Sequence, residues 1–489
     1  MKPVFKLYLM PDKSPKFYVT TSIAYTNASP HLGFALETVQ ADVAARYRRL
    51  QGEDVFFLTG TDEHGQKVVK AAEKAGQSPK DFTDRISGEF RRLAEVLNIS
   101  NDDFIRTTDQ KKHWPTVQKV WMELKEKGDI YKKNYKGLYC PGCEAFITRK
   151  DLAGGKCAIH HISPEVVEEE NYFFKLSKYS KEIEKILEKE EIKIIPETRK
   201  NEMLSFVKQG LEDISFSRPR KDLQWGVPVP DDDTQTIYVW GDALTNYISA
   251  LGYDKNSAKF KKYWPADIHF IGKDIQKFHC LIWPGMLLSL GIPLPKKIFV
   301  HGFINVGGQK MSKSLGNIVD PFKLAEKYGT DAVRYFLLRE IPSAEDGDFT
   351  EEKFEKRYNS DLASGLGNLT ARVITMAGKL KVKRPKLKPE SENMKAINEC
   401  WDKYKKSMSE LKFNEALASV WELIGWCDRY IEKERPWEKG GNQEEVIGSL
   451  LLTIEEIAEL LIPFLPNASA EILKQLRSQK TQPIFPRMQ

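Results

Sequence analysis

The clearest candidate for chemistry in this sequence is a short run of lysines and serines between glycines. Lys310-Met311-Ser312-Lys313-Ser314 follows Gly307-Gly308 and precedes Leu315-Gly316-Asn317. Glycine allows a positive φ and lets the backbone come close to a ligand. Two ammonium groups in such a loop can neutralise the charge that develops on a polyphosphate. The run is equally typical of a solvated surface loop, so its function depends on a second motif.

That second motif lies near the N-terminus. Pro30-His31-Leu32-Gly33-Phe34 follows a strand-like run at residues 17–23 and opens an amphipathic helical pattern. A glycine turn between a strand and a helix predicts a phosphate site, because free backbone N–H groups and the helix dipole point at it. The segment lacks the glycine spacing of a dinucleotide fingerprint and the Gly-Lys-Ser/Thr ending of a P-loop.

Together, HLGF at 31–34 and KMSKS at 310–314 resemble the paired signatures of class I aminoacyl-tRNA synthetases. Within that class the chain resembles the methionyl-tRNA synthetase family over nearly its whole length. The resemblance implies that methionine and ATP, accompanied by Mg²⁺, form an adenylate from which tRNA is charged. Phe34 departs from the usual His-Ile-Gly-His signature, and its ring cannot hydrogen-bond a phosphate. The catalytic residues implied are His31, Gly33, Lys310, Ser312, Lys313 and Ser314.

The elements that must position these motifs alternate between strand and helix. Residues 1–113 and 226–320 read as the two halves of an α/β, doubly wound, Rossmann-like parallel-sheet catalytic domain. Ligands of such sheets bind beyond the carboxyl ends of the strands. We therefore expect Tyr25, Asp62 and the His31 turn to converge on one crevice.

Residues that would bind the substrates follow from the resemblance. It assigns Asp62 to the amino group of methionine, a charge-assisted pairing. Trp240, Ala243, Leu244 and Tyr247 share one helix face, a pattern that also fits plain core. Gly241 replaces a larger apolar residue of the family, so we expect a looser pocket rim. The methionine-binding residues implied are Ile23, Tyr25, Asp62, Trp240, Ala243, Leu244, Tyr247 and His301. Those implied for ATP are Glu37, Gly272, Asp274 and Lys313; for Glu37, a solvated carboxylate is the alternative.

An insertion at residues 114–225 carries a metal-binding pattern. Cys140 and Cys143 are followed by Cys157 and His160. Three thiolates and one imidazole at this spacing predict a closed, structural Zn²⁺ site. His161 is an alternative ligand to His160. There are two alternatives to a zinc site. The insertion could keep the fold of a former zinc site without binding metal, or the cysteines could have a redox function.

The remainder of the chain is helical. Residues 321–355 read as a linking segment, and residues 356–489 as an antiparallel α-helical bundle. In the family this bundle reads the anticodon, and the matching residues are Asn368, Arg372 and Trp437. An aromatic ring that stacks on a splayed base suits single-stranded RNA. Taken alone, Trp437 also fits a buried bundle tryptophan, and the basic connector 379–388 fits a solvated loop.

Composition agrees with a multidomain enzyme. The 489 residues predict roughly two to four domains. No apolar run reaches about 18 residues, so no membrane partner is expected. Residues 1–16 make a poor transit peptide, and six cysteines are too few for a disulfide scaffold, so we expect a cytoplasmic protein. A net charge of +6 permits a local basic face for tRNA, and DNA is not an expected partner. The absence of an appended domain favours a monomer.

Two other functions fit parts of this sequence. One is a class I synthetase for another apolar amino acid; the cysteine cluster and the short insertion, which leaves no room for a large editing domain, favour methionine instead. The other is a catalytically silent tRNA-binding paralogue, and Phe34 alone favours it. The two differ in ATP turnover, because the paralogue would bind tRNA without activating an amino acid.

Overall fold

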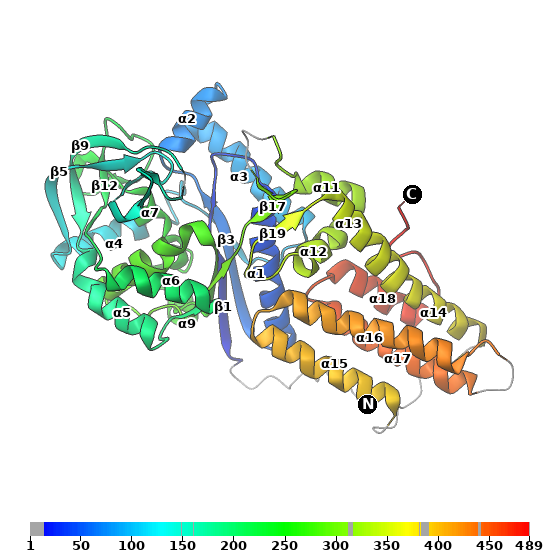
Figure 1. The fold of residues 1–489 in the computed structure, drawn as a ribbon. Coiled ribbons are helices and arrows are strands. Elements are labelled where there is room, and N and C mark those ends of the chain that lie inside the picture. Colours follow the sequence, from blue (N-terminus) through cyan, green and yellow to red (C-terminus); the bar gives the residue numbers. More distant parts are fainter. Residues whose placement is uncertain are drawn as a thin grey trace.

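The structure is a computed structural model that describes residues 14–147, 149–159, 161–311, 316–380, 382, 391–438 and 442–488. In Figure 1 the described chain forms a central sheet, an insertion of antiparallel strands and short helices on one side of it, and a bundle of long helices on the other. None of the helices in these ranges has the length and apolar character that a membrane span requires.

The described residues form a central sheet of seven parallel strands: β1 (Lys16–Thr21), β2 (Ala24–Tyr25), β3 (Asp54–Asp62), β4 (Asp103–Arg106), β10 (Lys193–Ile195), β15 (Ile268–Gly272) and β16 (Lys297–His301). Their order is β10-β16-β15-β1-β3, and β2 and β4 both pair with β3. The chain proceeds from β1 to β3 and β4 on one side, and later to β15 and β16 on the other. The strand order therefore reverses between β1 and β15, where α/β sheets bind ligands.

Apolar side chains alternate between the two faces of the sheet and build two cores. Tyr18 and Phe56 point into one core, and their neighbours Val19 and Phe57 point into the other. Both faces of a parallel sheet must be covered, which explains the nearly continuous apolar strands. One face is covered by α1 (Leu32–Leu50) and α12 (Thr330–Arg339), and the other by α4 (Trp114–Glu126) and α10 (Trp283–Leu290). Between β3 and β4 lie α2 (Gln66–Lys74) and α3 (Pro79–Val96).

The insertion is built on an antiparallel sheet in the order β11-β9-β5-β6. The strands of this sheet are β5 (Ile130–Cys140), β6 (Ala145–Ile147), β9 (Glu165–Phe174) and β11 (Ile214–Ser215), and β7 (Leu152–Ala153) pairs separately with β8 (Lys156–Cys157). A further antiparallel sheet has the order β12-β14-β13 and extends past the expected end at residue 225; its strands are β12 (Ser217–Pro219), β13 (Pro228–Val229) and β14 (Asp232–Ile237). One difference from the expected insertion 114–225 concerns β10, which lies between α5 (Ser180–Glu188) and α6 (Glu197–Lys208). It pairs in parallel with β16, so the insertion returns an edge strand to the catalytic sheet.

The helical part begins with α11 (Pro321–Tyr328), α12 and α13 (Glu351–Arg357). A π-helical segment, Tyr358–Gly367, joins α13 directly to α14 (Asn368–Leu380). The bundle is completed by α15 (Glu392–Ser409), α16 (Phe413–Glu434), α17 (Gln443–Leu461) and α18 (Pro466–Ser478). Their buried faces join the core that lies over α1. The predicted fold class, a doubly wound parallel sheet with a cysteine-containing insertion and a helical C-terminal region, is confirmed.

Candidate active site

A cavity of about 670 Å³ opens at the carboxyl ends of the strands, beside the β1/β15 switch point. This volume suits a ligand of the size of an aminoacyl-adenylate. The insertion contributes to its wall through Tyr139, Glu144 and Ile159, among others. Predicted residues from six segments line it: Ile23, Tyr25, His31, Gly33, Glu37, Asp62, Trp240, Ala243, Leu244, Tyr247, Gly272, Asp274, His301 and Lys310. The convergence expected from strand–helix alternation is therefore present.

The first signature forms the N-terminus of α1. His31 is the N-cap residue, and its Nδ1 accepts a hydrogen bond of 3.1 Å from Gly33 N–H. Phe34 points into a small apolar cluster, where its ring meets Phe90 edge to face with centroids 4.8 Å apart. The backbone N–H groups of Gly33, Phe34 and Ala35 all donate to His31. The helix end therefore offers the cavity the positive end of its dipole, and Phe34 contributes packing instead of a polar contact.

Asp62 is a buried carboxylate on the cavity wall, at the carboxyl end of β3. Within the described residues, the hydrogen-bond donors to this carboxylate are distant: His64 N–H at 3.4 Å and Thr107 Oγ1 at 3.5 Å. Burial, and then the charge of Asp242, raise the pKa of Asp62 well above its usual range. A ligand ammonium group would offset this penalty, so the site suits an amino acid.

Tyr25 lies beside Asp62, since the two residues are register partners on β2 and β3. The Tyr25 hydroxyl donates a hydrogen bond of 2.6 Å to Glu144 Oε2 in the insertion. Burial, and then the charge of Glu144, raise the pKa of Tyr25 well above its usual range, so the phenol remains a neutral donor. Ile23 lines the same cavity, between β1 and β2.

An aromatic wall lies on the other side of the cavity. It comes from two short helices, α7 (Val239–Ala243) and α8 (Asn246–Ser249), rather than the single expected helix. The Trp240 ring stacks on Phe278 with centroids 3.7 Å apart. Trp240, Ala243, Leu244 and Tyr247 all line the cavity, so they form pocket and not only core. Aromatic rings are favourable partners for a thioether sulfur.

Three residues of this wall are not among those predicted from the sequence. Ile275, Phe278 and His279 line the cavity, and His279 is buried. Its Nδ1 lies 3.0 Å from Ile275 O, to which it donates, so Nε2 accepts from the Tyr247 hydroxyl at 2.7 Å. Burial lowers the pKa of His279 to about 4, which keeps the ring neutral. Ile275, Phe278 and His279 lie in the first turns after β15, which is one of the two strands at the switch point. This position could have identified them as cavity residues from the sequence.

Gly241 does not loosen the pocket rim, contrary to the expectation. A Cβ placed on Gly241 would lie 2.6 Å from Cζ of Phe216. Phe216 is fully buried and belongs to the core under the insertion. An aromatic ring from the insertion therefore fills the space that a larger residue at position 241 would need.

His301, at the carboxyl end of β16, and Glu37, on α1, form a buried pair. The Nε2 of His301 lies 2.9 Å from Glu37 Oε2, and its Nδ1 lies 2.8 Å from Gly302 O. Glu37 Oε1 also accepts from Ser22 N–H at 2.7 Å and from Ser22 Oγ at 2.6 Å. Burial opposes protonation of His301, but the bond to Glu37 outweighs it and raises the pKa of His301.

This arrangement rules out one alternative: Glu37 is buried, so it is not a solvated carboxylate. His301 lines the cavity, and its contact with the methionine side chain stays a prediction. The imidazole that is bonded to Tyr247 is that of His279. Near His301 lie Gly272, at the end of β15, and the exposed carboxylate of Asp274.

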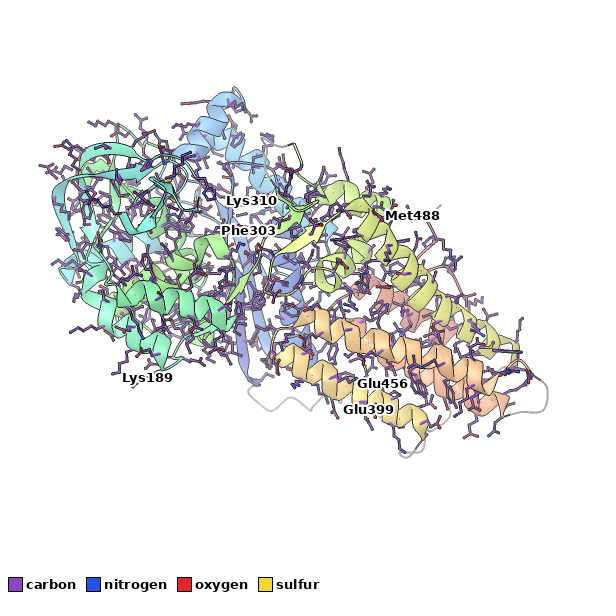
Figure 2. All side chains as sticks on the ribbon, in the orientation of Figure 1. Lys189, Phe303, Lys310, Glu399, Glu456 and Met488 are labelled. Atoms are coloured by element: carbon purple, nitrogen blue, oxygen red, sulfur yellow. The ribbon has the colours of Figure 1, made fainter. Side chains whose placement is uncertain are left out.

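The second signature begins on a small sheet beside the cavity. It consists of β17 (Ile304–Val306), β18 (Gln309–Lys310) and β19 (Gly347–Phe349). The exposed Lys310 places its Nζ 4.9 Å from the centroid of the Phe303 ring. Both residues are labelled in Figure 2, close to each other. Phe303 itself lines the cavity. Ser312, Lys313 and Ser314 lie outside the described residues.

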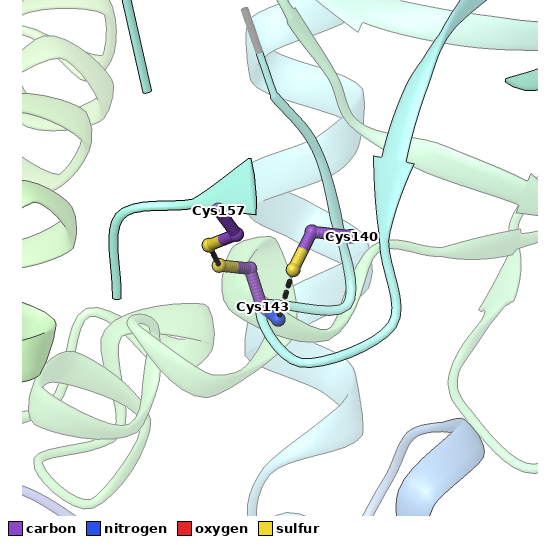
Figure 3. A group of neighbouring side chains, drawn as sticks. All are labelled: Cys140, Cys143 and Cys157. Carbon is purple, nitrogen blue, oxygen red and sulfur yellow. Dashed lines mark hydrogen bonds between the residues drawn. The ribbon is translucent and has the colours of Figure 1, made fainter. Parts of the chain in front are cut away.

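Three cysteines of the insertion form a compact thiol group (Figure 3). The Sγ atoms of Cys140, Cys143 and Cys157 lie within 4.8 Å of one another, and those of Cys143 and Cys157 are 3.6 Å apart. Ligands of tetrahedral zinc at Zn–S distances of about 2.3 Å would be ~3.8 Å apart, so the three thiols fit this metal. His160 lies outside the described residues, and the side chain of His161 is exposed and not part of the group.

The candidate anticodon residues lie together at one end of the bundle. Arg372 on α14 has its guanidinium carbon 5.1 Å from the centroid of the Trp437 ring, and its Nη2 lies 3.0 Å from Glu432 Oε1. Trp437 is 48% exposed, so it is not a buried bundle tryptophan. Asn368, one turn before Arg372, is also exposed. An exposed aromatic ring flanked by a cation is a suitable platform for a base.

Comparisons with known proteins identify the family. A family model described as "tRNA synthetases class I (M)" matches residues 17–157 and 147–374, and one described as "Anticodon-binding domain of tRNA ligase" matches residues 393–486. Methionine–tRNA ligase from Thermotoga maritima is 45% identical over 477 residues, which cover 94% of this chain and 75% of that protein. The relative of the same name from Brucella suis is 42% identical over 471 residues, covering 94% and 91%.

Two solved structures extend the match to the whole fold. Mycobacterium tuberculosis methionyl-tRNA synthetase in complex with methionyl-adenylate has a TM-score of 0.90 and 38% identity, covering 97% of this chain and 100% of that chain. The apo form of that enzyme has a TM-score of 0.83 and 35% identity, covering 97% and 99%. The chain therefore belongs to the methionine–tRNA ligase family of class I tRNA synthetases.

Proposed function

We propose that this protein ligates L-methionine to its tRNA at the expense of ATP, through a methionyl-adenylate intermediate. The observation that carries the proposal is the shared cavity, in which a buried carboxylate, an aromatic wall and the two signatures meet. The family relationship agrees with it, because the relatives are named methionine–tRNA ligases and one structure holds methionyl-adenylate.

Methionine is oriented by two sets of residues. The Asp62 carboxylate receives the ammonium group, and the thioether lies among Trp240, Tyr247 and Phe278, with Ile23, Tyr25, Ala243 and Leu244 around them. These contacts direct the methionine carboxylate toward the α-phosphate of ATP. Since Tyr25 and Asp62 are register partners, the amino group and the side-chain pocket are held at a fixed spacing.

In the first step a carboxylate oxygen attacks the α-phosphorus of ATP, and the bond between that phosphorus and the bridging oxygen to the β-phosphate breaks. Pyrophosphate leaves with its electron pair, and little proton transfer is needed, so positioning and charge stabilisation supply the catalysis. The His31 ring binds phosphate oxygens, and Gly33 lets the phosphates come close to the N-terminus of α1. Lys310 and Lys313 neutralise the developing charge, and Ser312 and Ser314 donate hydrogen bonds.

The nucleotide lies at the ends of β15 and β16. Asp274 accepts from the ribose, and Gly272 allows the close approach of the nucleotide. Glu37 acts here by orienting the His301 ring, to which it is hydrogen-bonded. His301 also completes the wall of the methionine pocket. Mg²⁺ would accompany ATP and would supply charge neutralisation when bound.

The bundle selects the tRNA, whose terminal ribose hydroxyl then takes the methionyl group from the adenylate and releases AMP. Trp437 stacks on an anticodon base, and Asn368 and Arg372 bind base edges. Cys140, Cys143, Cys157 and His160 would hold Zn²⁺, which would stabilise the insertion when bound. Because all six cysteines are free thiols, we place the enzyme in the cytoplasm. We further propose that it is a monomer and that DNA is not a partner.

The test is exchange of labelled pyrophosphate into ATP, without tRNA, across a panel of apolar amino acids. Exchange with methionine alone supports the proposal and shows that Phe34 is tolerated. Exchange with another amino acid would overturn the specificity. A folded protein that binds tRNA but supports no exchange would be a catalytically silent paralogue.

A further inference from the structure

Glu144 lies at the junction of the cysteine group and the methionine pocket. It directly follows Cys143 in the sequence and is 7% exposed. Its φ is +52°, a left-handed conformation that L-residues other than glycine seldom adopt. A buried carboxylate in a strained backbone conformation persists only where the surrounding structure holds it. The contacts of Glu144 identify what holds it.

Its two carboxylate oxygens bind two different elements. Oε2 accepts from the Tyr25 hydroxyl at 2.6 Å, and Oε1 accepts from the backbone N–H of Lys67 at 2.7 Å. Lys67 lies in the first turn of α2, where an acceptor for a free N–H is favourable. The Lys67 ammonium also donates to Gly142 O, in the loop between Cys140 and Cys143. The loop that carries two of the cysteines is therefore joined to Tyr25 and to α2.

A glycine makes room for this connection. Gly65 has φ +110°, and a Cβ there would lie 2.4 Å from the Tyr25 hydroxyl and 3.2 Å from Glu144 Oε1. Any side chain at position 65 would displace the phenol or the carboxylate. Tyr25, in turn, is the register partner of Asp62 on the adjacent strand.

We propose that Glu144 is a positioning residue for methionine, which fixes the Tyr25 phenol from the cysteine-bearing loop and so shapes the pocket beside Asp62. The inference rests on the proposed function, in which Tyr25 contacts methionine. Glu144 does not contact the reacting atoms of methionine or ATP; it acts through Tyr25. The cysteine-bearing loop thereby has a role in amino-acid binding, in addition to its role in the structure of the insertion.

The test measures the methionine Kd by calorimetry, and the KM values for methionine and ATP in pyrophosphate exchange. Glu144→Ala should raise the methionine Kd by about tenfold, the order expected for a hydrogen bond to a charged group, and leave the KM for ATP within about twofold. Tyr25→Phe should weaken methionine binding as well. The double variant should bind methionine no more weakly than Glu144→Ala, because both changes remove the same hydrogen bond. Glu144→Gln keeps one acceptor and should give an intermediate Kd.

Glu168→Ala is the matched control, since Glu168 lies in the same insertion, is exposed and pairs with Lys136; its methionine Kd should equal that of the wild type. The proposal would be overturned if the effects of Glu144→Ala and Tyr25→Phe on methionine binding added fully in the double variant. It would also be overturned if Glu144→Ala left the methionine Kd unchanged. Loss of bound zinc in Glu144→Ala would also overturn it, because the residue would then serve the metal site. If Tyr25→Phe alone has no effect, the site assignment of Tyr25 fails instead.

Discussion

Arg334 and Asp42 form a fully buried ion pair between the catalytic sheet and the helical bundle. The Nη2 of Arg334, on α12, lies 2.8 Å from Oδ2 of Asp42, on α1, and neither side chain is exposed. The same guanidinium donates to the carbonyl oxygens of Leu97, Pro463 and Phe464, the last two in the turn before α18. Since α1 begins at His31, one side chain links the helix of the first signature to the bundle.

Replacing Arg334 by Met should destabilise the protein by about 3–5 kcal/mol, the range for breaking a buried ion pair from one side. Asp42 would keep its bonds to Arg46 and Ser100, but three buried carbonyls would lose a donor. Scanning calorimetry or urea unfolding measures the change. Lys403→Ala, which removes an exposed pair with Glu422, is the control and should cost under about 1 kcal/mol. Equal losses for the two variants would contradict this role of Arg334.

Methionine binding should weaken as the pH falls, because Asp62 must be ionised to pair with an ammonium group. Burial and the Asp242 charge raise the pKa of Asp62, so in the free enzyme the carboxylate takes up a proton at a higher pH than an ordinary aspartate. The methionine Kd, followed by calorimetry from pH 8 downward, should therefore rise as the pH falls through that raised pKa. Asp62→Asn should bind about 10- to 100-fold more weakly at pH 8 and lose this pH dependence.

Asp222→Asn is the control for the Asp62 experiment, since Asp222 is exposed and lies outside the cavity. It should keep both the affinity and the pH profile of the wild type. A pH profile that persists unchanged in Asp62→Asn would assign the titration to another group of the cavity, and the ammonium contact would have to be placed elsewhere.

Much of the site follows from the sequence because its residues lie at strand ends. The parallel topology brings every such end to one edge of the sheet, so His31, Asp62 and Gly272 converge whatever the details of packing. The cysteine group is equally predictable, since thiols spaced as Cys140, Cys143 and Cys157 have few other uses together.

What the sequence does not reveal depends on contacts between distant residues. The space beside Gly241 is taken by Phe216, and Glu37 binds a histidine 264 residues away. Neither pairing has a local pattern. The strand β10 is three residues long and flanked by helices, so its hydrophobic run is too short to be distinguished from the insertion around it.

Trp437→Ala should separate tRNA recognition from amino-acid activation. The ring is half exposed and adjoins Arg372, and stacking on a base contributes about 1–3 kcal/mol. The KM for tRNA should therefore rise by roughly 5- to 100-fold, while methionine-dependent pyrophosphate exchange stays at the wild-type rate. Lys433→Ala, which removes an exposed cation of the neighbouring helix α16, controls for general loss of charge. A fall in exchange with tRNA affinity unchanged would rule out the anticodon role.

Glu459 should make the bundle less stable as the pH rises from about 4.5 to about 7. It is half-buried on α17, and its Oε2 has no hydrogen-bond partner among the described residues. Burial, and then the charges of Glu456 and Glu455, raise the pKa of Glu459 to about 7. The folded state thus holds a proton that the unfolded chain releases near pH 4.5, so this contribution to stability is lost between about pH 4.5 and pH 7.

Glu459→Gln removes that titration, because the amide is neutral at every pH. The Tm of the variant should exceed that of the wild type most at pH 8, and the difference should shrink toward zero near pH 4.5, measured by calorimetry in matched buffers. Glu471→Gln is a control of opposite sign: Glu471 accepts bonds from Gln475 and Lys474, which lower its pKa, so its replacement should not raise the Tm at pH 8. If the two variants gave the same Tm profile, the pH dependence would not belong to Glu459, and the next carboxylate to replace would be Glu456, whose burial also raises its pKa.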